Sequence, residues 1–307
     1  MNNKLKTRSL RPGGRYWIWY ALPALIFYAL FMAYPLLDSI RLSFYTGSSG
    51  NREFAGLANY VKLFTDPVMG ASYRNALLNT FLFFIIHMLV QNVLGIFFAN
   101  LLTKKGMRFS RFYQTIIFIP VTFAVLVTGY LWKLLLNPAW SGKVLTDIGL
   151  GFLSQPWLGQ KSTALVCVAL VSCWQWVGIP TMLFMAGMQN ISGDYLEAAE
   201  MDGANSRQIF WKIKLPALRP VVGMVSILTF VNNFNAFDIV FAMETANGAP
   251  SYATDLLGTL FYRTGIAGQH PVGIPDPGLG AAIATITFLI LVIGTVPTLR
   301  ATQTKGE

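Results

Sequence analysis

The sequence predicts an all-α membrane protein with six transmembrane helices, and three of its features support this prediction. Of its 307 residues, 54% are hydrophobic and only 12% are charged, whereas soluble domains carry about 25% charged residues. Six apolar stretches are long enough to supply the roughly 20 residues with which a helix crosses a bilayer. Lys and Arg residues are concentrated in alternate segments between these stretches, as in proteins that cross the membrane several times.

The predicted spans are each bounded by charged residues, and they lie at about 16–37, 76–102, 112–136, 163–188, 220–243 and 279–299. With the N-terminus inside, fifteen Lys and Arg residues are on the inside and seven are on the outside. The positive-inside rule therefore predicts that both termini lie in the cytoplasm. We expect a basic cytoplasmic arm over 1–15, one transmembrane domain over 16–300, and a cytoplasmic tail over 301–307.

Composition also argues against other classes of protein. The net charge of +10 is better explained by basic cytoplasmic loops than by nucleic-acid binding, which needs a basic face on a soluble domain. The basic start of the chain precedes an apolar stretch that is too long for a signal peptide, so a permanent membrane anchor is expected. Cys167 and Cys173 lie about 9 Å apart along one predicted helix, so they are expected to pack rather than to form a disulfide.

One polar segment lies between the fourth and fifth predicted spans, on the cytoplasmic side. Ser192 or Asp194 can cap a first short helix, and Gly203 can end it in a left-handed turn. Asn205 or Ser206 can then cap a second short helix. The segment is therefore predicted to form two short helices joined by an elbow. An amphipathic helix that rests on the lipid surface is the alternative.

The spacing of residues in this segment, 189–219, resembles the EAA loop of the membrane subunits of binding-protein-dependent ABC importers. The motif is Glu197-Ala198-Ala199, three residues, Gly203, nine residues, Ile213, one residue and Leu215-Pro216, and every position matches. In that family the loop is the coupling helix, which sits in a cleft of a separate cytoplasmic ATPase subunit. The resemblance implies that the residues coupling to the ATPase are Glu197, Ala198, Ala199, Asp202, Gly203, Ala204, Ile213, Leu215 and Pro216.

The resemblance also implies a mechanism, a set of partners and a location. Closure of two ATPase subunits on ATP would move the docked loops and switch the side of the membrane to which the spans open. The other implied partners are a second permease of similar fold, which completes a heterodimer, and an external sugar-binding protein. The implied location is the bacterial cytoplasmic (inner) membrane, in which the chain is a multi-pass protein.

The chain itself is not expected to be an enzyme. It contains no GxxxxGK[ST] phosphate-binding loop, so ATP and Mg²⁺ are expected on the partner ATPase. Ser, His and Asp residues occur, but nothing in the sequence brings them together as a hydrolytic triad. We expect no catalytic residue, no metal site and no cofactor in this chain.

Several stretches resemble the carbohydrate-uptake branch of the family, and in particular the larger subunit of maltose permeases. They include "FAGLANYVKLFTDP", "YLEAAEMDGA" and "FVNNFNAFDIVFAMETANGAP". This chain departs from that subunit because it has neither the extra N-terminal spans nor the large external domain. It also has Ala249 where the usual "NGGP" has a glycine. The resemblance therefore implies a sugar as cargo, an oligosaccharide or a glycoside first among the candidates, and these departures leave open which sugar it is.

The resemblance places the sugar at mid-membrane, between the two spans that flank the EAA loop. By position, the candidate substrate-binding residues are Trp174, Val177, Gly178, Thr181, Asn233, Asn235 and Ala236. Asn side chains can donate to and accept from sugar hydroxyls, and Trp offers a flat apolar face to a sugar ring. The alternative is that the polar residues only bond neighbouring helices and that the Trp is a packing residue.

His87, Gln91 and Asn92 in the second span present the same two alternatives, because each could line the path or bond a neighbouring helix. The alternative function is an ion-coupled secondary transporter or another polytopic membrane protein. Such a carrier usually has ionisable residues deep in several spans. The first, second, fourth and sixth predicted spans contain no Asp, Glu, Lys or Arg, which favours the importer subunit.

Overall fold

A computed structural model describes residues 16–47, 52–104 and 106–302. Its long helices and helix segments are α1 (Tyr16–Tyr28), α2 (Tyr34–Leu42), α4 (Pro67–Ile86), α5 (Asn92–Leu102), α6 (Ser110–Phe118), α7 (Val125–Leu135), α9 (Ala164–Trp176), α10 (Gly178–Gln189), α14 (Arg219–Phe234) and α17 (Pro277–Thr302). The shorter helices are α3 (Ala58–Thr65), α8 (Pro138–Asp147), α11 (Gly193–Met201), α12 (Ser206–Ile209), α13 (Leu215–Ala217), α15 (Asp238–Glu244) and α16 (Leu257–Tyr262).

Short irregular turns and one small hairpin complete the secondary structure. Among the described residues, π-helical turns occur at η1 (Ala29–Ala33), η2 (His87–Gln91), η5 (Phe210–Lys214) and η6 (Arg263–Ala267). Two 3₁₀ turns, η3 (Ile119–Thr122) and η4 (Gly151–Leu153), interrupt the third span region and the following loop. Strands β1 (Tyr45–Thr46) and β2 (Glu53–Phe54) pair antiparallel, with Tyr45 opposite Phe54.

The apolar helices agree with a membrane protein, but only some of them are straight enough to cross a bilayer alone. In the described part of the chain, three helices are long and apolar enough, at Ile18–Leu42, Pro67–Leu102 and Pro277–Arg300. Three further helix pairs meet the same test only together, and they bend by 97°, 47° and 67°. These pairs are Ser110–Thr122 with Val125–Leu135, Ala164–Trp176 with Gly178–Gln189, and Ser206–Ala217 with Arg219–Phe234.

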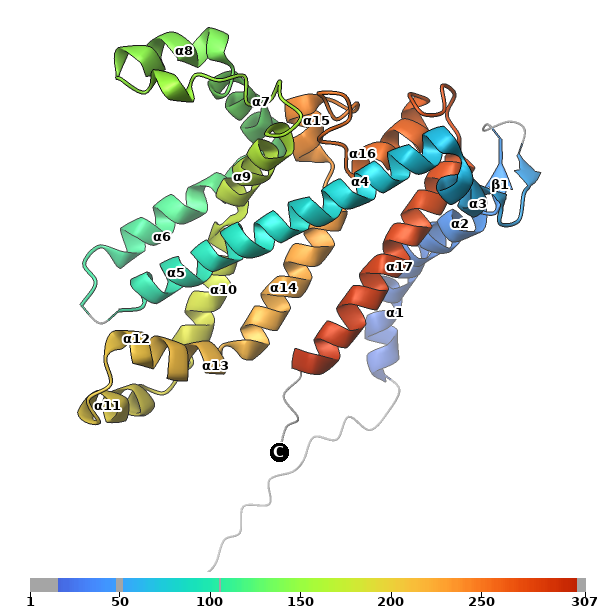
Figure 1. Cartoon of the computed structure of the whole chain (residues 1–307). Helices are drawn as coiled ribbons and strands as arrows, with labels where there is room; N and C mark the ends of the chain where they lie inside the picture. The colour runs from blue at the N-terminus through green and yellow to red at the C-terminus, as the bar shows by residue number, and fades with distance from the viewer. Residues whose placement is uncertain (1–15, 48–51, 105, 303–307) are drawn as a thin grey trace, which may run out of the picture.

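The long helices run side by side, and the shorter elements gather at the two ends of the molecule (Figure 1). One end carries the β-hairpin, α3, α8, α15 and α16. The opposite end carries α11, α12 and α13, and there α1 begins and α17 ends. The two ends of the molecule therefore carry different elements, and both ends of the described helical body lie on the side of α11–α13.

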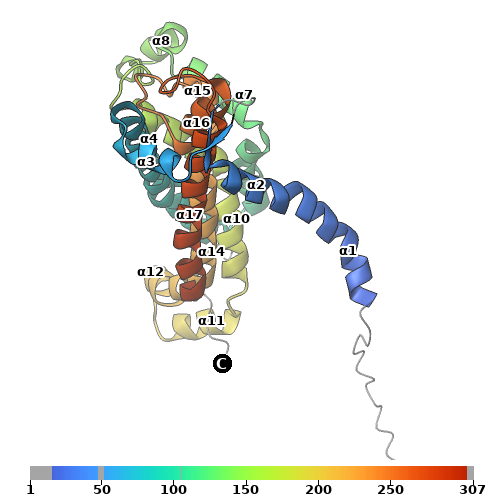
Figure 2. The ribbon, with the colours of Figure 1, turned by 90° about the vertical axis from the view of Figure 1, so that its right-hand side faces the viewer.

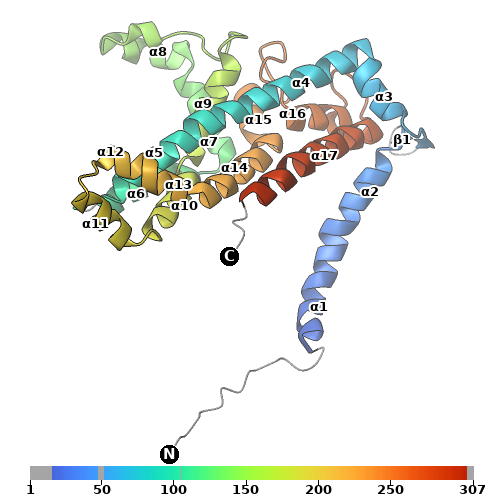
Figure 3. The same cartoon turned by 60° about the horizontal axis from the view of Figure 1, so that its bottom comes forward.

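The first helix stands apart from the rest of the protein. Figures 2 and 3 show α1 leading away from the other helices, whereas α2, which follows it, contacts α17. The apolar window within Ile18–Leu42 has none of its residues buried inside the chain, and Phe27 and Phe31 stack on each other at 6.0 Å. Such a helix needs lipid or another protein to cover it, because its side chains are as apolar as a core helix.

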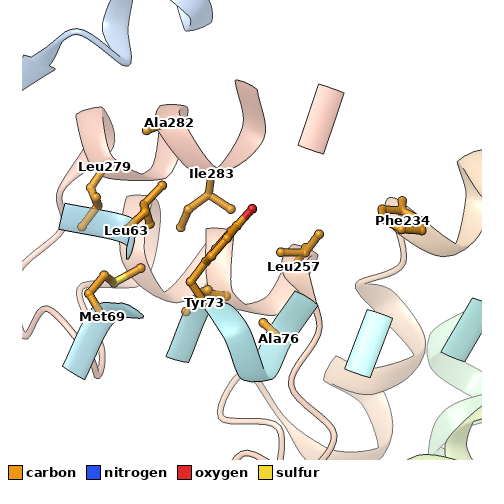
Figure 4. Close-up of a cluster of buried hydrophobic side chains, with 10 residues drawn as sticks. Leu63, Met69, Tyr73, Ala76, Phe234, Leu257, Leu279, Ala282 and Ile283 are labelled. Atoms are coloured by element: carbon orange, nitrogen blue, oxygen red, sulfur yellow. The ribbon is translucent and has the colours of Figure 1, made fainter. Parts of the chain in front are cut away.

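A cluster of buried apolar side chains joins the second and sixth spans to the end that carries the hairpin. The cluster in Figure 4 brings together Leu63 of α3, Tyr73 of α4, Leu257 of α16 and Ile283 of α17. Phe234, the last residue of α14, also belongs to it and is 1% exposed. The end of α14 is therefore held firmly, although the helix itself stops there.

The predicted spans agree with the structure in position but not in continuity. The first helix continues to Leu42, and the second begins nine residues earlier than expected, at Pro67. The predicted spans 112–136, 163–188 and 220–243 are not single continuous helices in the structure. The first two are broken at 122–125 and 176–178, and α14 ends at Phe234 before the separate helix α15. A hydropathy pattern gives the length of an apolar stretch but not the backbone bends within it.

A buried ion pair stabilises the segment between α15 and α17. Arg263 Nη2 donates to Asp255 Oδ2, and neither side chain is exposed. Thr259 Oγ1 donates to the other carboxylate oxygen at 2.7 Å, and the guanidinium carbon of Arg263 lies 4.7 Å from the ring centre of Tyr252. A second ion pair, between Arg41 and Asp38 at 2.8 Å, lies on the surface with side chains 69% and 39% exposed.

Because one ion pair is buried and the other is exposed, removing each of them should change the stability of the protein by a different amount. Asp255→Asn leaves a buried guanidinium without its counter-charge, which costs about 3–5 kcal/mol. Asp38→Asn removes an exposed pair worth about 0–1 kcal/mol. The midpoint of thermal denaturation of the detergent-solubilised protein should therefore fall strongly for Asp255→Asn and little for Asp38→Asn. Equal midpoints for the two variants would contradict this assignment.

Candidate functional site

The two spans that flank the 189–219 loop are both interrupted. The fourth span bends by 47° between Trp176 and Gly178. Pro180 contributes to this bend because it has no N–H for the carbonyl of Trp176, its partner four residues earlier. In the fifth span, α14 has 16 residues and is about 24 Å long, which is shorter than a hydrocarbon core of about 30 Å.

A cavity of about 300 Å³ lies at these two irregularities. Its walls come from the second span, the start of α7, the fourth span, α14 and the break that follows α14. The lining residues are Phe83, His87, Gln91, Val125, Ser172, Trp176, Ile179, Pro180, Leu183, Val225, Leu228, Thr229, Asn232, Asn233, Asn235, Ala236, Phe237, Asp238 and Ile239. The cavity is thus mostly apolar with several polar groups, which is typical of a small-molecule site.

A second, largely apolar groove of about 620 Å³ lies against the same break in the chain. It is lined by residues of α14, α16, η6 and α17, among them Phe261 and Phe288. Asn235 and Phe237 line both the cavity and this groove. The segment 235–237 is therefore a shared wall, and any movement of it would change the two spaces together.

The structure brings together some of the substrate-binding residues that the sequence predicts. Asn233, Asn235 and Ala236 line the cavity. The amide of Asn233 is buried and donates to the Thr229 carbonyl at 2.7 Å, so much of its hydrogen-bonding capacity serves its own helix. The amide of Asn235 donates to the Val231 carbonyl at 3.0 Å, but its side chain is exposed.

The four candidates from the fourth span lie outside the cavity lining. Trp174 packs edge-on against Trp132 at 5.3 Å and is 41% exposed. Thr181 is buried, and its hydroxyl donates to the Val177 carbonyl at 2.8 Å. The face that lines the cavity carries Trp176 instead. Residues two apart on a helix point about 200° apart, so a motif matched by position alone does not fix which Trp faces the cavity.

Gly178 has a packing role in this structure. A Cβ atom at this position would lie 2.9 Å from the Ile117 carbonyl oxygen and 3.0 Å from Val121 Cγ2. The glycine therefore allows the fourth span to approach the broken third span closely. Gln175 reinforces the same contact, because its Nε2 donates to the Phe123 carbonyl at 3.0 Å, within the break between η3 and α7.

Three polar residues of the second span differ in their hydrogen-bond partners. Asn92 Nδ2 donates to Thr229 Oγ1 at 3.1 Å, so Asn92 joins α5 to α14. His87 contacts Ser172 of the fourth span, with 3.0 Å between Nε2 and Oγ. Gln91 lines the cavity, and its buried Oε1 has no hydrogen-bond partner among the described residues. In the sequence, the four-residue spacing of positions 87 and 91, which places them on one helical face, could have indicated that both residues line the cavity.

The cytoplasmic segment forms the two short helices that the sequence predicts. Ser192 accepts a hydrogen bond from the Asp194 amide at 3.3 Å and is the cap of α11. Gly203 has φ of +81°, the left-handed conformation expected of the elbow. Asn205 caps α12 in a reciprocal pair with Gln208. The elbow and both caps are therefore confirmed, with Ser192 and Asn205 as the capping residues.

This loop is attached firmly to the ends of the spans. Phe210 packs against the cluster of Leu102, Met188 and Leu218, which joins the second, fourth and fifth spans. Lys214 Nζ donates to Asn100 Oδ1 of α5 at 3.2 Å. Partial burial of Lys214 lowers its pKa, and the neighbouring charge of Lys104 lowers it further, whereas Glu200 raises it. A force on the loop would therefore be transmitted to three spans.

The outer surface of the loop is available for contact with another protein. Glu197, Ala198, Asp202, Gly203 and Pro216 are exposed, while Ala199, Ala204, Ile213 and Leu215 are half-buried. Tyr195 and Met201, on the same short helix as Glu197, are 71% and 89% exposed. Large apolar side chains at such exposure next to small residues are typical of a docking surface.

An apolar helical body with a central cavity and a structured polar loop defines a membrane transport subunit. Residues 91–299 match the family described as "Binding-protein-dependent transport system inner membrane component". The chain belongs to this family. It is a membrane permease component of an ABC transporter, and it is not itself the enzyme of the system.

Comparison with individual proteins agrees with this family. The chain is 33% identical over 276 residues to the "Probable ABC transporter permease protein YurN" of Bacillus subtilis, covering 88% of this chain and 90% of that protein. It is 32% identical over 288 residues to the "Multiple sugar-binding transport system permease protein MsmF" of Streptococcus mutans, covering 92% and 93%. The specific resemblance to the larger maltose-permease subunit is only loosely supported by these relatives.

The fold also matches a solved transporter. A chain from the crystal structure of a bacterial ABC transporter involved in the import of the acidic polysaccharide alginate aligns with a TM-score of 0.78. The alignment covers 95% of this chain and 97% of that chain, at 19% sequence identity. At this identity the likeness establishes the fold and leaves the cargo of the present chain open.

The close contact at Gly178 makes a prediction that separates packing from ligand binding. Gly178→Ala forces a methyl group against the backbone of Ile117, and overpacking of this kind costs about 1–3 kcal/mol. Gly193→Ala is the control, since no atom lies within 4 Å of the added methyl group. The denaturation midpoint should fall for Gly178→Ala only. An unchanged midpoint combined with lost sugar uptake would instead support the ligand contact that the sequence predicts.

Proposed function

We propose that this chain is the membrane-spanning subunit of an ATP-driven importer that takes up a sugar delivered by an external binding protein. The observation that carries the proposal is the cytoplasmic loop over 189–219. It has the full EAA spacing, and it folds as two capped helices with a left-handed elbow at Gly203. Family membership independently supports the transport role.

The proposed topology has six spans, with both termini and the 189–219 loop in the cytoplasm. Three straight helices and three bent pairs supply six apolar segments of sufficient length. The start of α1 and the end of α17 lie at the same end as α11–α13 (Figure 1), and the basic residues favour that end as the inside. We place the protein in the bacterial inner membrane, as the family description suggests.

In the proposed mechanism, ATP affects this chain only through the contact between the chain and the ATPase subunits. ATP and Mg²⁺ bind to two separate ATPase subunits, and the surface formed by α11 and the elbow sits in a cleft of one of them. Closure of the ATPase pair moves the loop. Because Phe210 and Lys214 attach the loop to the second, fourth and fifth spans, these spans move with it and change the side to which the cavity opens.

A second permease of similar fold is the proposed neighbour within the membrane. Two features support it. The apolar window within Ile18–Leu42 has none of its residues buried within this chain, and the groove at Phe261 and Phe288 is largely apolar. One chain would form half of the translocation path, and the external binding protein would dock on the end that carries the hairpin, α8 and α16.

The proposed cargo is an oligosaccharide or a glycoside, and the lining of the cavity suits a sugar. The relative from Streptococcus mutans is named for a multiple sugar-binding transport system. The cavity combines the indole of Trp176 with the exposed amides of Asn232 and Asn235. An aromatic face and amide groups are suited to the apolar face and the hydroxyl groups of a sugar ring.

The elbow predicts how the loop responds to substitution. At φ of +81°, valine is strained by its branched Cβ, whereas asparagine is tolerated in the left-handed region. Gly203→Val should therefore reduce co-purification with the ATPase and ATP-dependent uptake, and Gly203→Asn should retain both. Both variants should insert normally, since no atom lies within 4 Å of the new Cβ. Full uptake by Gly203→Val would exclude the elbow as a coupling element.

The two neighbouring tryptophans provide a matched test of the cavity. Trp176→Ala should lower kcat/KM for sugar uptake by about tenfold, equivalent to about 1.4 kcal/mol, because Trp176 lines the cavity. Trp174→Ala should have a much smaller effect, because Trp174 packs outside it against Trp132. Uptake of radiolabelled sugar by the reconstituted transporter measures both. The reverse order would support the position-based assignment to Trp174.

A further inference from the structure

Four basic side chains lie near one another at the end of the molecule that carries α11–α13. Lys104 and Arg108 belong to the turn between α5 and α6, Arg111 belongs to the first turn of α6, and all three are exposed. Lys214 of η5 approaches the same end of α5, because its Nζ donates to Asn100 Oδ1 at 3.2 Å. Figures 1 and 3 show the start of α6 beside the end of α5 and near α12 and α13. We call these four basic residues the basic surface.

The basic surface has no paired acid. Within the described part of the chain, none of its four side chains forms an ion pair with a carboxylate, and the first turn of α6 contains no acidic residue. Its charges also act on one another. Partial burial lowers the pKa of Lys214, and the charge of Lys104 lowers it further, whereas Glu200 raises it. An anion bound between these cations would relieve their mutual repulsion.

An apolar face continues from the basic surface along the third span. Phe112, Ile116 and Ile119 are 61%, 48% and 44% exposed, and their spacing of four and three residues places them on one face of a helix. The segment 112–132 contains no charged residue, so this face lies in the apolar part of the span. Cations at the end of an exposed apolar face are complementary to a molecule with an anionic head and an apolar tail.

The charge of the basic surface distinguishes between the molecules that could cover this face. A second permease would also carry basic residues in its cytoplasmic loops, so it would place cations against cations. A cytoplasmic ATPase would contact the 189–219 loop and not an apolar face within the bilayer. An anionic phospholipid supplies both a phosphate for the cations and acyl chains for the apolar face. Clusters of Lys and Arg at the cytoplasmic end of a span are typical of anionic-lipid binding.

We propose that the basic surface binds the phosphate of an anionic phospholipid, with an acyl chain of the lipid along the apolar face of Phe112, Ile116 and Ile119. This inference rests on the proposed topology, which places this end of the third span at the cytoplasmic leaflet. Arginine can contact phosphate with two N–H groups, and lysine contacts it as a point charge. Because Lys214 belongs to the 189–219 loop, the bound lipid lies against the element that is proposed to couple to the ATPase.

The first test measures lipid binding to the complete, delipidated transporter in detergent by native mass spectrometry. Dioleoylphosphatidylglycerol should bind at least tenfold more tightly than dioleoylphosphatidylcholine, which has the same acyl chains and a phosphate but no net charge. Glycerophosphoglycerol, the same headgroup without acyl chains, should not bind at concentrations that saturate the lipid site. Equal affinity for the two lipids would overturn the proposal, and so would binding of glycerophosphoglycerol as tight as that of the anionic lipid.

Substitutions then test whether the tightest binding occurs at the basic surface. Arg108→Gln and Arg111→Gln should each weaken the binding of dioleoylphosphatidylglycerol about fivefold, which corresponds to about 1 kcal/mol for one basic residue near a membrane surface. Arg108→Lys and Arg111→Lys keep the positive charge and should keep most of the affinity. Lysine variants that bind as weakly as the glutamine variants would contradict a contact based on charge.

Arg300→Gln is the matched control. Arg300 is an exposed base at the end of α17, which lies on the same side of the molecule but apart from the start of α6 (Figures 1 and 3). This variant should bind the lipid as the wild type does. If it weakens binding as much as Arg108→Gln, the affinity comes from the overall charge of that side and the site is excluded.

Unchanged binding in both Arg108→Gln and Arg111→Gln would also exclude the site, because the lipid would then bind elsewhere on the transporter. The binding measurement requires no transport. A failure of the proposed import function would therefore be seen separately, as absence of ATP-dependent sugar uptake by a wild-type transporter that still binds the lipid.

Discussion

The structure depends on the requirement that backbone polar groups inside a bilayer be satisfied by the protein. Three apolar segments are broken or sharply bent, and each break frees backbone groups. Gln175 of the fourth span donates to the carbonyl of Phe123 at the break in the third. The amide of Asn235 donates to the carbonyl of Val231 at the end of α14. Breaks of this kind are tolerated where they are buried in protein or line a cavity, and two of them border the same cavity here.

This requirement divides the polar residues of the spans into two groups. Asn92 with Thr229, and Asn233 with the Thr229 carbonyl, hold helices together and have little capacity left for a ligand. Asn232, by contrast, lines the cavity and is exposed. The division explains how one membrane protein can keep a polar cavity without losing its packing.

The cytoplasmic loop and the cavity are parts of one mechanical unit. The loop packs through Phe210 on the cluster that joins the second, fourth and fifth spans, and the same three spans provide most of the cavity wall. The bend near Trp176 and the end of α14 at Phe234 divide the fourth and fifth spans into two parts. A displacement of the loop can therefore alter the cavity through rigid helices that meet at fixed bends, without unfolding any element.

The sequence by itself determined the apolar character, the approximate span positions and the polar loop with its caps and elbow. These features depend on local chemistry: hydrophobic length, capping side chains and the conformational freedom of Gly203. The tertiary structure alone decided the breaks within the third, fourth and fifth spans and the side chains that line the cavity. Trp176 rather than Trp174 lines it, and Gly178 packs against Ile117. Those outcomes depend on helix rotation and on contacts between segments distant in sequence, which spacing along one chain does not specify.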